Sequence, residues 1–229
     1  MHKRIPATIM PNPAQLPESF CWTRFGTESG EAIEDIVARK EQERLANGGV
    51  FLWGIGNSVG PAVRELVRST SNPCVVFSPM RSKPKAIDVA PPSLLTWTGA
   101  TTLDGDDWAI PAGSRVISRG SSEGQREKTA HYALVCRSPS PLALCAGIAD
   151  IAYEALVNFL SGTKLGHSQV TAVVRRGQAL VASPTIYPAA FMAELVYPFF
   201  VRLHNPLSDD KPDARVRARP MQPSLLASV

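Results

Sequence analysis

The sequence lacks the features that mark disulfide-rich, metal-binding and membrane-spanning chains. Its four cysteines are far apart, show no Cys-x-x-Cys spacing and lie among apolar residues, as buried thiols usually do. The four histidines are equally scattered, so the sequence predicts no metal site, no disulfide framework and no cofactor. The basic N-terminus is followed by prolines rather than by an apolar segment, which argues against a signal peptide. We therefore expect a cytoplasmic protein that does not act at a membrane.

One long apolar run, Leu142 to Leu160, approaches the length needed to cross a bilayer. Asp150 and Glu154 lie near its middle, where charge is costly in lipid. We interpret the run as a buried or amphipathic helix with Pro141 in its first turn.

The 229 residues are 44% hydrophobic and 19% charged, which is enough to bury a sizeable core. The formal net charge is +4 and the sequence pI is about 9.0, a mild basic excess that permits an acidic partner such as nucleic acid. Composition divides the chain into a Pro-rich N-terminal arm over 1–17, one domain over 18–207 and a flexible basic tail over 208–229. The arginines of this tail stand at alternate positions: Arg215, Arg217 and Arg219.

Hydrophobic periodicity predicts more strands than helices. Because several neighbouring strands are joined by loops of hairpin length, the pattern favours an α+β domain with a curved sheet or small β-barrel. The expected strands are Phe20–Phe25, the run after Gly49, Cys74–Phe77, Ser93–Thr98, His131–Arg137, a hairpin of Gln169–Arg175 with Ala179–Ala182, and Phe191–Leu203 bent at Pro198. Leu103 to Glu127 is predicted to be mostly loop, around a short segment at Trp108.

The first helix is expected to begin at Ser29 as N-cap and to end at Asn47-Gly48-Gly49. Its apolar stripe is predicted to contain Ala32, Ile33, Ile36, Val37 and Leu45. Its solvated face is predicted to contain Arg39, Lys40, Glu41 and Glu43. A second, shorter helix is expected from Pro61 to Arg68.

The stretch Gly48 to Pro61 joins these two helices through a strand and a turn of small residues. Its Gly56-Asn57-Ser58-Val59-Gly60 matches the G-x-S-x-G nucleophile elbow, which needs a strand before the serine and a helix after it. A hydrolase of that type lays down several strands before its elbow, whereas one precedes this serine, and no histidine stands in a triad context. Ser58 as a helix cap is therefore the favoured interpretation. The spacing G-x-G-x-x-x-G is one residue too long for a dinucleotide fingerprint.

The order of elements resembles the opening of the YTH and EVE domains in the PUA-like superfamily. An aromatic strand, a Ser/Glu-containing turn and an amphipathic helix precede Gly-Val-Phe-Leu-Trp, and Asn57, a short helix and Val75-Val76-Phe77-Ser78 follow. The likeness covers residues 20–80, and residues 90–203 by strand order only. The chain departs from YTH domains after Phe77, where the glycine-rich aromatic strand often found there is missing.

The resemblance implies a small β-barrel flanked by helices that holds a modified base in an aromatic cage. By position, Trp53 matches the cage tryptophan that follows the Gly-Val step, and Asn57 matches the turn asparagine. Thr27-Glu28-Ser29 matches the polar edge that contacts the base. No motif fixes the second wall, for which the candidates, in order, are Trp97, Trp22 and Trp108.

The residue types fit this chemistry independently of the resemblance. A base stacks on aromatic side chains with roughly 1–3 kcal/mol per base, and polar groups read its edge. Core positions are the alternative for these tryptophans, and are favoured for Trp22 and Trp97. The candidate phosphate-binding residues are Arg81, Lys83 and Lys85, or Arg115, Arg119, Arg126 and Lys128.

The sequence thus predicts a non-catalytic module that binds DNA or RNA carrying a modified base, with Trp53 as its central residue. An enzyme is the alternative class, either a serine hydrolase using Ser58 or an amidohydrolase on a PUA-like barrel. A third alternative is a protein-interaction module in which the helix 142–160 is partly exposed to a protein partner.

Overall fold

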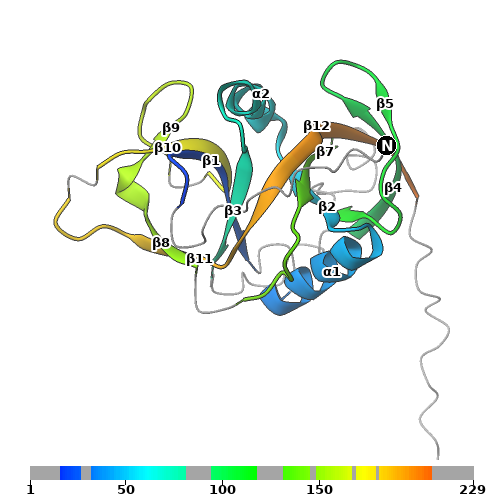
Figure 1. The fold of residues 1–229 in the computed structure, drawn as a ribbon, viewed down its shortest axis with the longest axis horizontal. Helices are drawn as coiled ribbons and strands as arrows, with labels where there is room; N and C mark the ends of the chain where they lie inside the picture. Colours follow the sequence, from blue (N-terminus) through cyan, green and yellow to red (C-terminus); the bar gives the residue numbers. More distant parts are fainter. Residues whose placement is uncertain are drawn as a thin grey trace, which may run out of the picture.

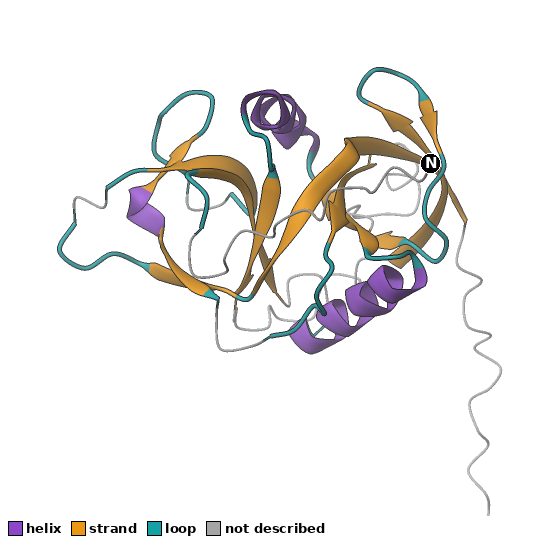
Figure 2. Cartoon of the chain, viewed as in Figure 1, coloured by secondary structure: helices purple, strands orange, loops and turns teal. Residues whose placement is uncertain are grey.

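The fold is α+β, as the sequence predicts. A computed structural model describes residues 16–26, 32–80, 94–117, 131–144, 148–166, 169–178 and 181–207. Within these residues ten strands form one mixed sheet, and two strands form a separate ladder. Two α-helices, α1 (Ile33–Ala46) and α2 (Gly60–Ser69), pack against the large sheet. The strands curve into two lobes, with α2 above the junction and α1 along the opposite side (Figures 1 and 2).

The large sheet has the order β2-β7-β12-β3-β1-β10-β9, with β4 beside β12 and with β5 and β6 beside β4. Its only parallel pair among the described residues is β1 with β3. Its strands are β1 (Ser19–Gly26), β2 (Val50–Ile55), β3 (Cys74–Met80), β4 (Leu94–Thr102), β5 (Asp107–Trp108), β6 (Arg115–Ile117), β7 (His131–Arg137), β9 (Leu156–Asn158), β10 (Thr171–Arg176) and β12 (Phe191–Leu207). The separate ladder joins β8 (Ala149–Ala152) to β11 (Ile186–Ala189).

The long strand β12 connects the two lobes. Phe191–Glu194 pair with β3, whereas Val201–Leu207 pair with β4. We call the part containing β2, β4 to β7 and the second half of β12 the β4 lobe, and the part containing β1, β3 and β8 to β11 the β9 lobe. The predicted bend at Pro198 is confirmed: the register with β7 shifts between Leu195 and Phe200. Phe199 within this bulge has φ 66°, a conformation rare for a bulky side chain.

Three apolar clusters fill the structure. The central core lies between the lobes and takes Val63 and Leu66 from α2 and Ile36 from α1. A second cluster fills the β9 lobe and a third fills the β4 lobe. Successive residues of a strand point to opposite faces, so β2 serves two cores: Trp53 enters the central core and Leu52 the β4-lobe core.

The predicted helix over 142–160 is wrong. The chain instead forms β8, a 3₁₀ turn at Tyr153–Ala155 and β9. Ile151, Tyr153 and Leu156 bury their side chains in the β9-lobe core, in an extended arrangement that pairs with β10 and β11. Tertiary pairing with strands that follow later in the chain therefore overrides the helix propensity of this alanine-rich run.

The first helix ends where the sequence predicts, with Asn47 as its C-cap, but it differs from expectation at its start and on one face. It begins at Ile33 with Ala32 at the N-cap position, so the predicted cap Ser29, which lies outside the described residues, is wrong. Lys40 and Glu43, predicted on the solvated face, are 3% and 4% exposed, whereas Leu45, predicted to be apolar and buried, is 65% exposed. The helix therefore packs through part of its charged face.

The predicted hairpin after Gln169 is half right. Its first strand is β10, but β10 pairs with β1 and β9. Residues 179 and 180 lie outside the described residues, and 181 and 182 form a bend rather than a returning strand. The sequence also does not predict β6 or β11. Both strands are short and are stabilised by pairing with other strands, β4 and β8.

Candidate functional site

Trp53 lies near the end of β2 and points into the central core between the lobes. Its exposed fraction is 7%. The ring of Phe25 meets the indole at a centroid distance of 5.3 Å and an interplanar angle of 76°, and the ring of Phe77 at 4.7 Å and 69°. Edge contacts of this kind favour both partners through the ring quadrupoles. Trp53 is therefore one member of a group of packed rings.

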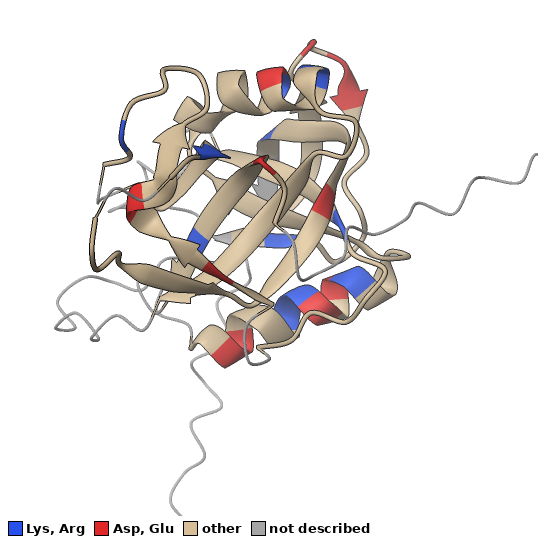
Figure 3. Cartoon of the chain, turned by 60° about the vertical axis from the view of Figure 1, so that its left-hand side comes forward, with Lys and Arg blue, Asp and Glu red and all other residues tan. Residues whose placement is uncertain are grey.

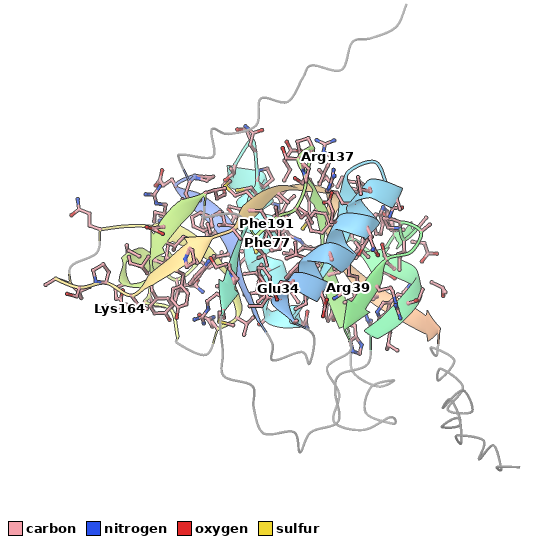
Figure 4. The ribbon with its side chains drawn as sticks, turned by 90° about the horizontal axis from the view of Figure 1, so that it is seen from below. Glu34, Arg39, Phe77, Arg137, Lys164 and Phe191 are labelled. Carbon is pink, nitrogen blue, oxygen red and sulfur yellow. The ribbon has the colours of Figure 1, made fainter. Side chains whose placement is uncertain are left out.

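A further ring, Phe191, belongs to this group. Phe191 stacks on Phe77 with centroids 4.6 Å apart and planes 22° from parallel, and it meets Phe25 at 6.0 Å. We call Phe25, Trp53, Phe77 and Phe191 the aromatic cluster. Figure 4 shows Phe77 and Phe191 side by side at the centre of the molecule, next to the helix that carries Glu34. The four residues come from β1, β2, β3 and β12, which lie far apart in sequence.

The aromatic cluster reaches the edge of the sheet at which β1 and β3 end. These parallel strands run in register, with Phe25 opposite Pro79 and Gly26 opposite Met80. A Cβ on Gly26 would lie 2.5 Å from the backbone oxygen of Met80, so only glycine permits this approach. The predicted base-edge and phosphate residues follow directly in the chain and lie outside the described residues: Thr27, Glu28 and Ser29 after β1, and Arg81, Lys83 and Lys85 after β3.

A buried ion pair of α1 supports the strand that carries Trp53. Glu43 Oε1 accepts a hydrogen bond of 2.7 Å from the backbone N–H of Leu52, and its other oxygen bonds Lys40 Nζ at 2.7 Å. Lys40 Nζ also donates to the backbone oxygen of Arg115 in β6, at 2.9 Å. Burial lowers the pKa of Lys40, and the charge of Glu43 opposes this shift.

The pair bridges β2 and β6 in the β4 lobe. We call the junction between these two strands the seam. Among the described residues no ladder joins β2 to β6, although a Cβ on Gly54 of β2 would overlap Cγ1 of Val116 in β6. Glu43 and Lys40 each bond one backbone group across this seam, in place of the missing strand-to-strand hydrogen bonds. The seam therefore fixes β2, and with it the backbone next to Trp53.

The turn after Trp53 has the strand–turn–helix context of a nucleophile elbow. Asn57 and Ser58 are exposed and belong to a 3₁₀ helix, Asn57–Val59, that leads into α2. Neither this turn nor α2 has a side-chain cap bond, so the prediction of Ser58 as a helix cap is wrong.

No triad surrounds Ser58 in the described part of the chain. None of the hydrogen bonds there joins Ser58 to a histidine. His131 packs against Trp97 with ring centroids 4.7 Å apart, and His204 lies against Gly99. Both of these histidines belong to strands of the β4 lobe.

The three tryptophans considered for the second wall do not join the aromatic cluster. Trp97 lies in the β4-lobe core and its Nε1 donates to Val116 O at 3.4 Å. Trp108 packs at the edge of the same core. Trp22 lies in the β9-lobe core and its Nε1 donates to Ser78 Oγ at 2.9 Å. The rings that contact Trp53 are instead those of Phe25 and Phe77. Phe25 lies in the first strand that the sequence predicts.

The predicted basic residues are divided between described and undescribed segments. Arg115 is half-buried in β6, where its backbone oxygen accepts from Lys40 and from Arg39. It lies at the seam, not in the aromatic cluster. The remaining candidates, Arg119, Arg126 and Lys128, lie outside the described residues. Blue and red segments alternate along α1 and α2 in the view of Figure 3.

A second ring cluster, which sequence reasoning missed, surrounds Arg24 in the β9 lobe. Its guanidinium carbon lies 5.3 Å from the ring centre of Trp22, 5.7 Å from that of Tyr153 and 5.2 Å from that of Tyr187. Arg24 also donates to the Tyr187 hydroxyl at 3.1 Å and to the backbone oxygen of Gln169. These contacts fasten the 3₁₀ turn at Tyr153–Ala155 and strand β11 to β1, in part by cation–π attraction.

The described cysteines are protected thiols. Burial raises the pKa of Cys74 to about 12, and it raises the pKa values of Cys21 and Cys136 above the ordinary value as well. In the described residues, no group of three or more His, Cys, Asp and Glu side chains is arranged to hold a metal ion. None of the helices described is both long and apolar enough to cross a bilayer.

Comparisons with known proteins found no match: no family model, no curated protein and no solved structure is similar enough to the chain. The interpretation of the site therefore depends on its own residues.

Proposed function

We propose that this protein is a non-catalytic, cytoplasmic module that binds nucleic acid and holds a modified base against Trp53. The observation that supports it is the position of the aromatic cluster, which reaches the sheet edge where Gly26 and Met80 end the paired strands. The resemblance of residues 20–80 to YTH and EVE domains leads to the same proposal.

The chemistry of the aromatic cluster suits a flat, apolar ligand. A base stacked on an indole gains roughly 1–3 kcal/mol, and a methyl group on the base adds apolar surface that prefers an aromatic surround to water. Trp53 is 7% exposed, so a base can stack on its indole only if a neighbouring ring moves. Phe25, one residue before the end of β1, is the ring whose displacement admits the base.

Charge supports the choice of partner. The chain carries 24 Lys and Arg against 20 Asp and Glu, a net +4 that favours association with phosphates. The basic residues that follow Met80 in the chain, Arg81, Lys83 and Lys85, are proposed to hold the backbone on either side of the base, while Asn57, Thr27, Glu28 and Ser29 contact its edge.

The experiment compares binding of the wild type, Trp53→Ala and Trp97→Ala to short single- and double-stranded DNA and RNA. Each probe is used unmodified and with common methylated bases, at two salt concentrations. Trp97 is the matched control because it is equally buried, at 5% exposed, but lies in the β4-lobe core. We expect a preference for one modified probe that Trp53→Ala loses and Trp97→Ala keeps, in samples shown to be folded by circular dichroism.

Two results would contradict the proposal. Salt-sensitive binding without any preference for a modified base would show that the protein binds nucleic acid only through its basic surface. No binding to any probe would reject nucleic acid as the partner, and the Ser58→Ala variant would then be compared with wild type in esterase assays.

A further inference from the structure

Arg175 and Lys164 stand on one face of the β9 lobe, on either side of a single residue. Arg175 of β10 is paired with Val157 of β9, and Val157 is bridged on its other side to Lys164. Directly opposed residues of antiparallel strands point to the same face, and neighbouring strands lie about 4.8 Å apart. The backbone positions of the two residues are therefore about 10 Å apart across β9.

Phe159 holds the side chain of Arg175 in place. The guanidinium carbon lies 5.3 Å from the ring centre of Phe159, within the range of a cation–π contact. The backbone N–H of Phe159 donates to Val173 O at 3.0 Å, and its ring packs against the central core. The ring thus covers one side of the guanidinium, whose N–H groups remain in place to donate to an oxyanion.

Among the described residues, neither cation has an acidic partner. Both residues are exposed, and within the part of the chain that the structure describes neither forms an ion pair. The neighbouring Arg176 differs, because its guanidinium donates to Leu16 O at 2.8 Å. The acidic residue of the adjacent 3₁₀ turn, Glu154, accepts two hydrogen bonds from Thr185.

This face continues from the proposed base site. Val173 alternates with Arg175 along β10 and enters the central core, which also contains Trp53. The turn Asn57–Val59 contacts β10. Figure 4 shows Lys164 on the lobe to one side of Phe77 and Phe191. A nucleic-acid strand with one base at Trp53 can therefore run along the β9 lobe.

We propose that Arg175 and Lys164 bind phosphates of the nucleic-acid strand next to the base held at Trp53. This inference rests on the proposed function and assigns it a second contact surface. Phosphate contacts contribute affinity that is independent of sequence and sensitive to salt.

The test measures affinity for the modified and the unmodified single strand over a series of salt concentrations. The variants are Arg175→Ala with Lys164→Ala together, and Arg202→Ala as a control, an exposed arginine on the β4 lobe. Each phosphate contact to a single strand contributes about 0.7 to the slope of log affinity against log salt. The double variant is expected to lower the slope by about 1.4. It should weaken both probes by the same factor, while Arg202→Ala changes neither.

The outcomes separate this inference from the proposed function. An unchanged slope in a folded double variant would overturn the phosphate contact, even if the preference for the modified base persists. A lowered slope in a protein without that preference would support the contact and reject the base site. An equal loss in Arg202→Ala would overturn the assignment to this face, and no binding by the wild type would overturn both.

Discussion

Lys40 Nζ lies 2.7 Å from Glu43 Oε2, and the two side chains are 4% and 2% exposed. This pair bonds the backbones of β2 and β6 at the seam of the β4 lobe. Removing one member leaves an uncompensated buried charge, which typically costs about 3–5 kcal/mol. We therefore expect Lys40→Met to lose stability of that order in urea unfolding. Glu34→Gln, an exposed change on the same helix, should stay within about 0.5 kcal/mol. Equal stability of the two variants would show that the seam does not depend on the pair.

The close contact of β2 with β6 gives a second prediction. A Cβ on Gly54 would overlap Val116, whereas one on Gly56 would meet nothing within 4 Å. Gly54→Ala is expected to destabilise by about 1–3 kcal/mol through overpacking, and Gly56→Ala to have little effect. Adding Val116→Ala to Gly54→Ala should restore part of the loss relative to the sum of the single changes. Strict additivity in this double-mutant cycle would contradict the close contact.

Stability should depend on Glu41 at acid pH. The hydrogen bond from Arg44 lowers the pKa of Glu41, helped by one from the Leu142 backbone and opposed by burial. The pKa of Glu41 is lower in the folded than in the unfolded protein. At pH values near and between these two pKa values, the unfolded chain therefore binds more protons. The contribution is full above the ordinary value of 4.5 and is lost as pH falls through the folded pKa. Unfolding of Glu41→Gln at pH 7 and at pH 3 should therefore show a smaller stability difference from wild type at pH 3. A difference that stays constant would contradict the shift.

The buried thiols should be unreactive in the folded protein. In a Cys145→Ser background, which removes the cysteine outside the described residues, three thiols remain: Cys21, Cys74 and Cys136. Their raised pKa values and burial disfavour the thiolate, which is the reactive form. A chromogenic thiol reagent at pH 8 is expected to modify them only after denaturant is added. Rapid labelling under native conditions would show that one of these cores opens.

Sequence reasoning succeeded where a local pattern decides the structure. The apolar run ending at Trp53, bounded by Gly49 and Pro61, was enough to predict a strand and the helix after it. It failed where distant partners decide. The run from Leu142 to Leu160 satisfies a helix as well as a strand, and only pairing with β10 and β11 selects the strand.

The same distinction applies to the site. Trp53 was identified from its local context, but the partners of its ring, Phe77 and Phe191, depend on the antiparallel register of β3 with β12. Lys40 and Glu43 resemble an ordinary solvated i, i+3 pair, and their burial depends on β6, which the sequence predicts as loop. The position of Trp53 on a strand before a turn could thus be predicted from the sequence, but the rings that pack against it could not.

Tryptophan fluorescence during titration with the preferred nucleic acid tests most directly whether a base contacts Trp53. The comparison uses Trp53→Phe and Trp97→Phe, which keep an aromatic ring at each buried position. A base stacked on the indole quenches its emission, so we predict quenching in the wild type and in Trp97→Phe, and its loss in Trp53→Phe. Quenching that persists unchanged in Trp53→Phe would contradict the central claim, because the bound base would then lie against another tryptophan.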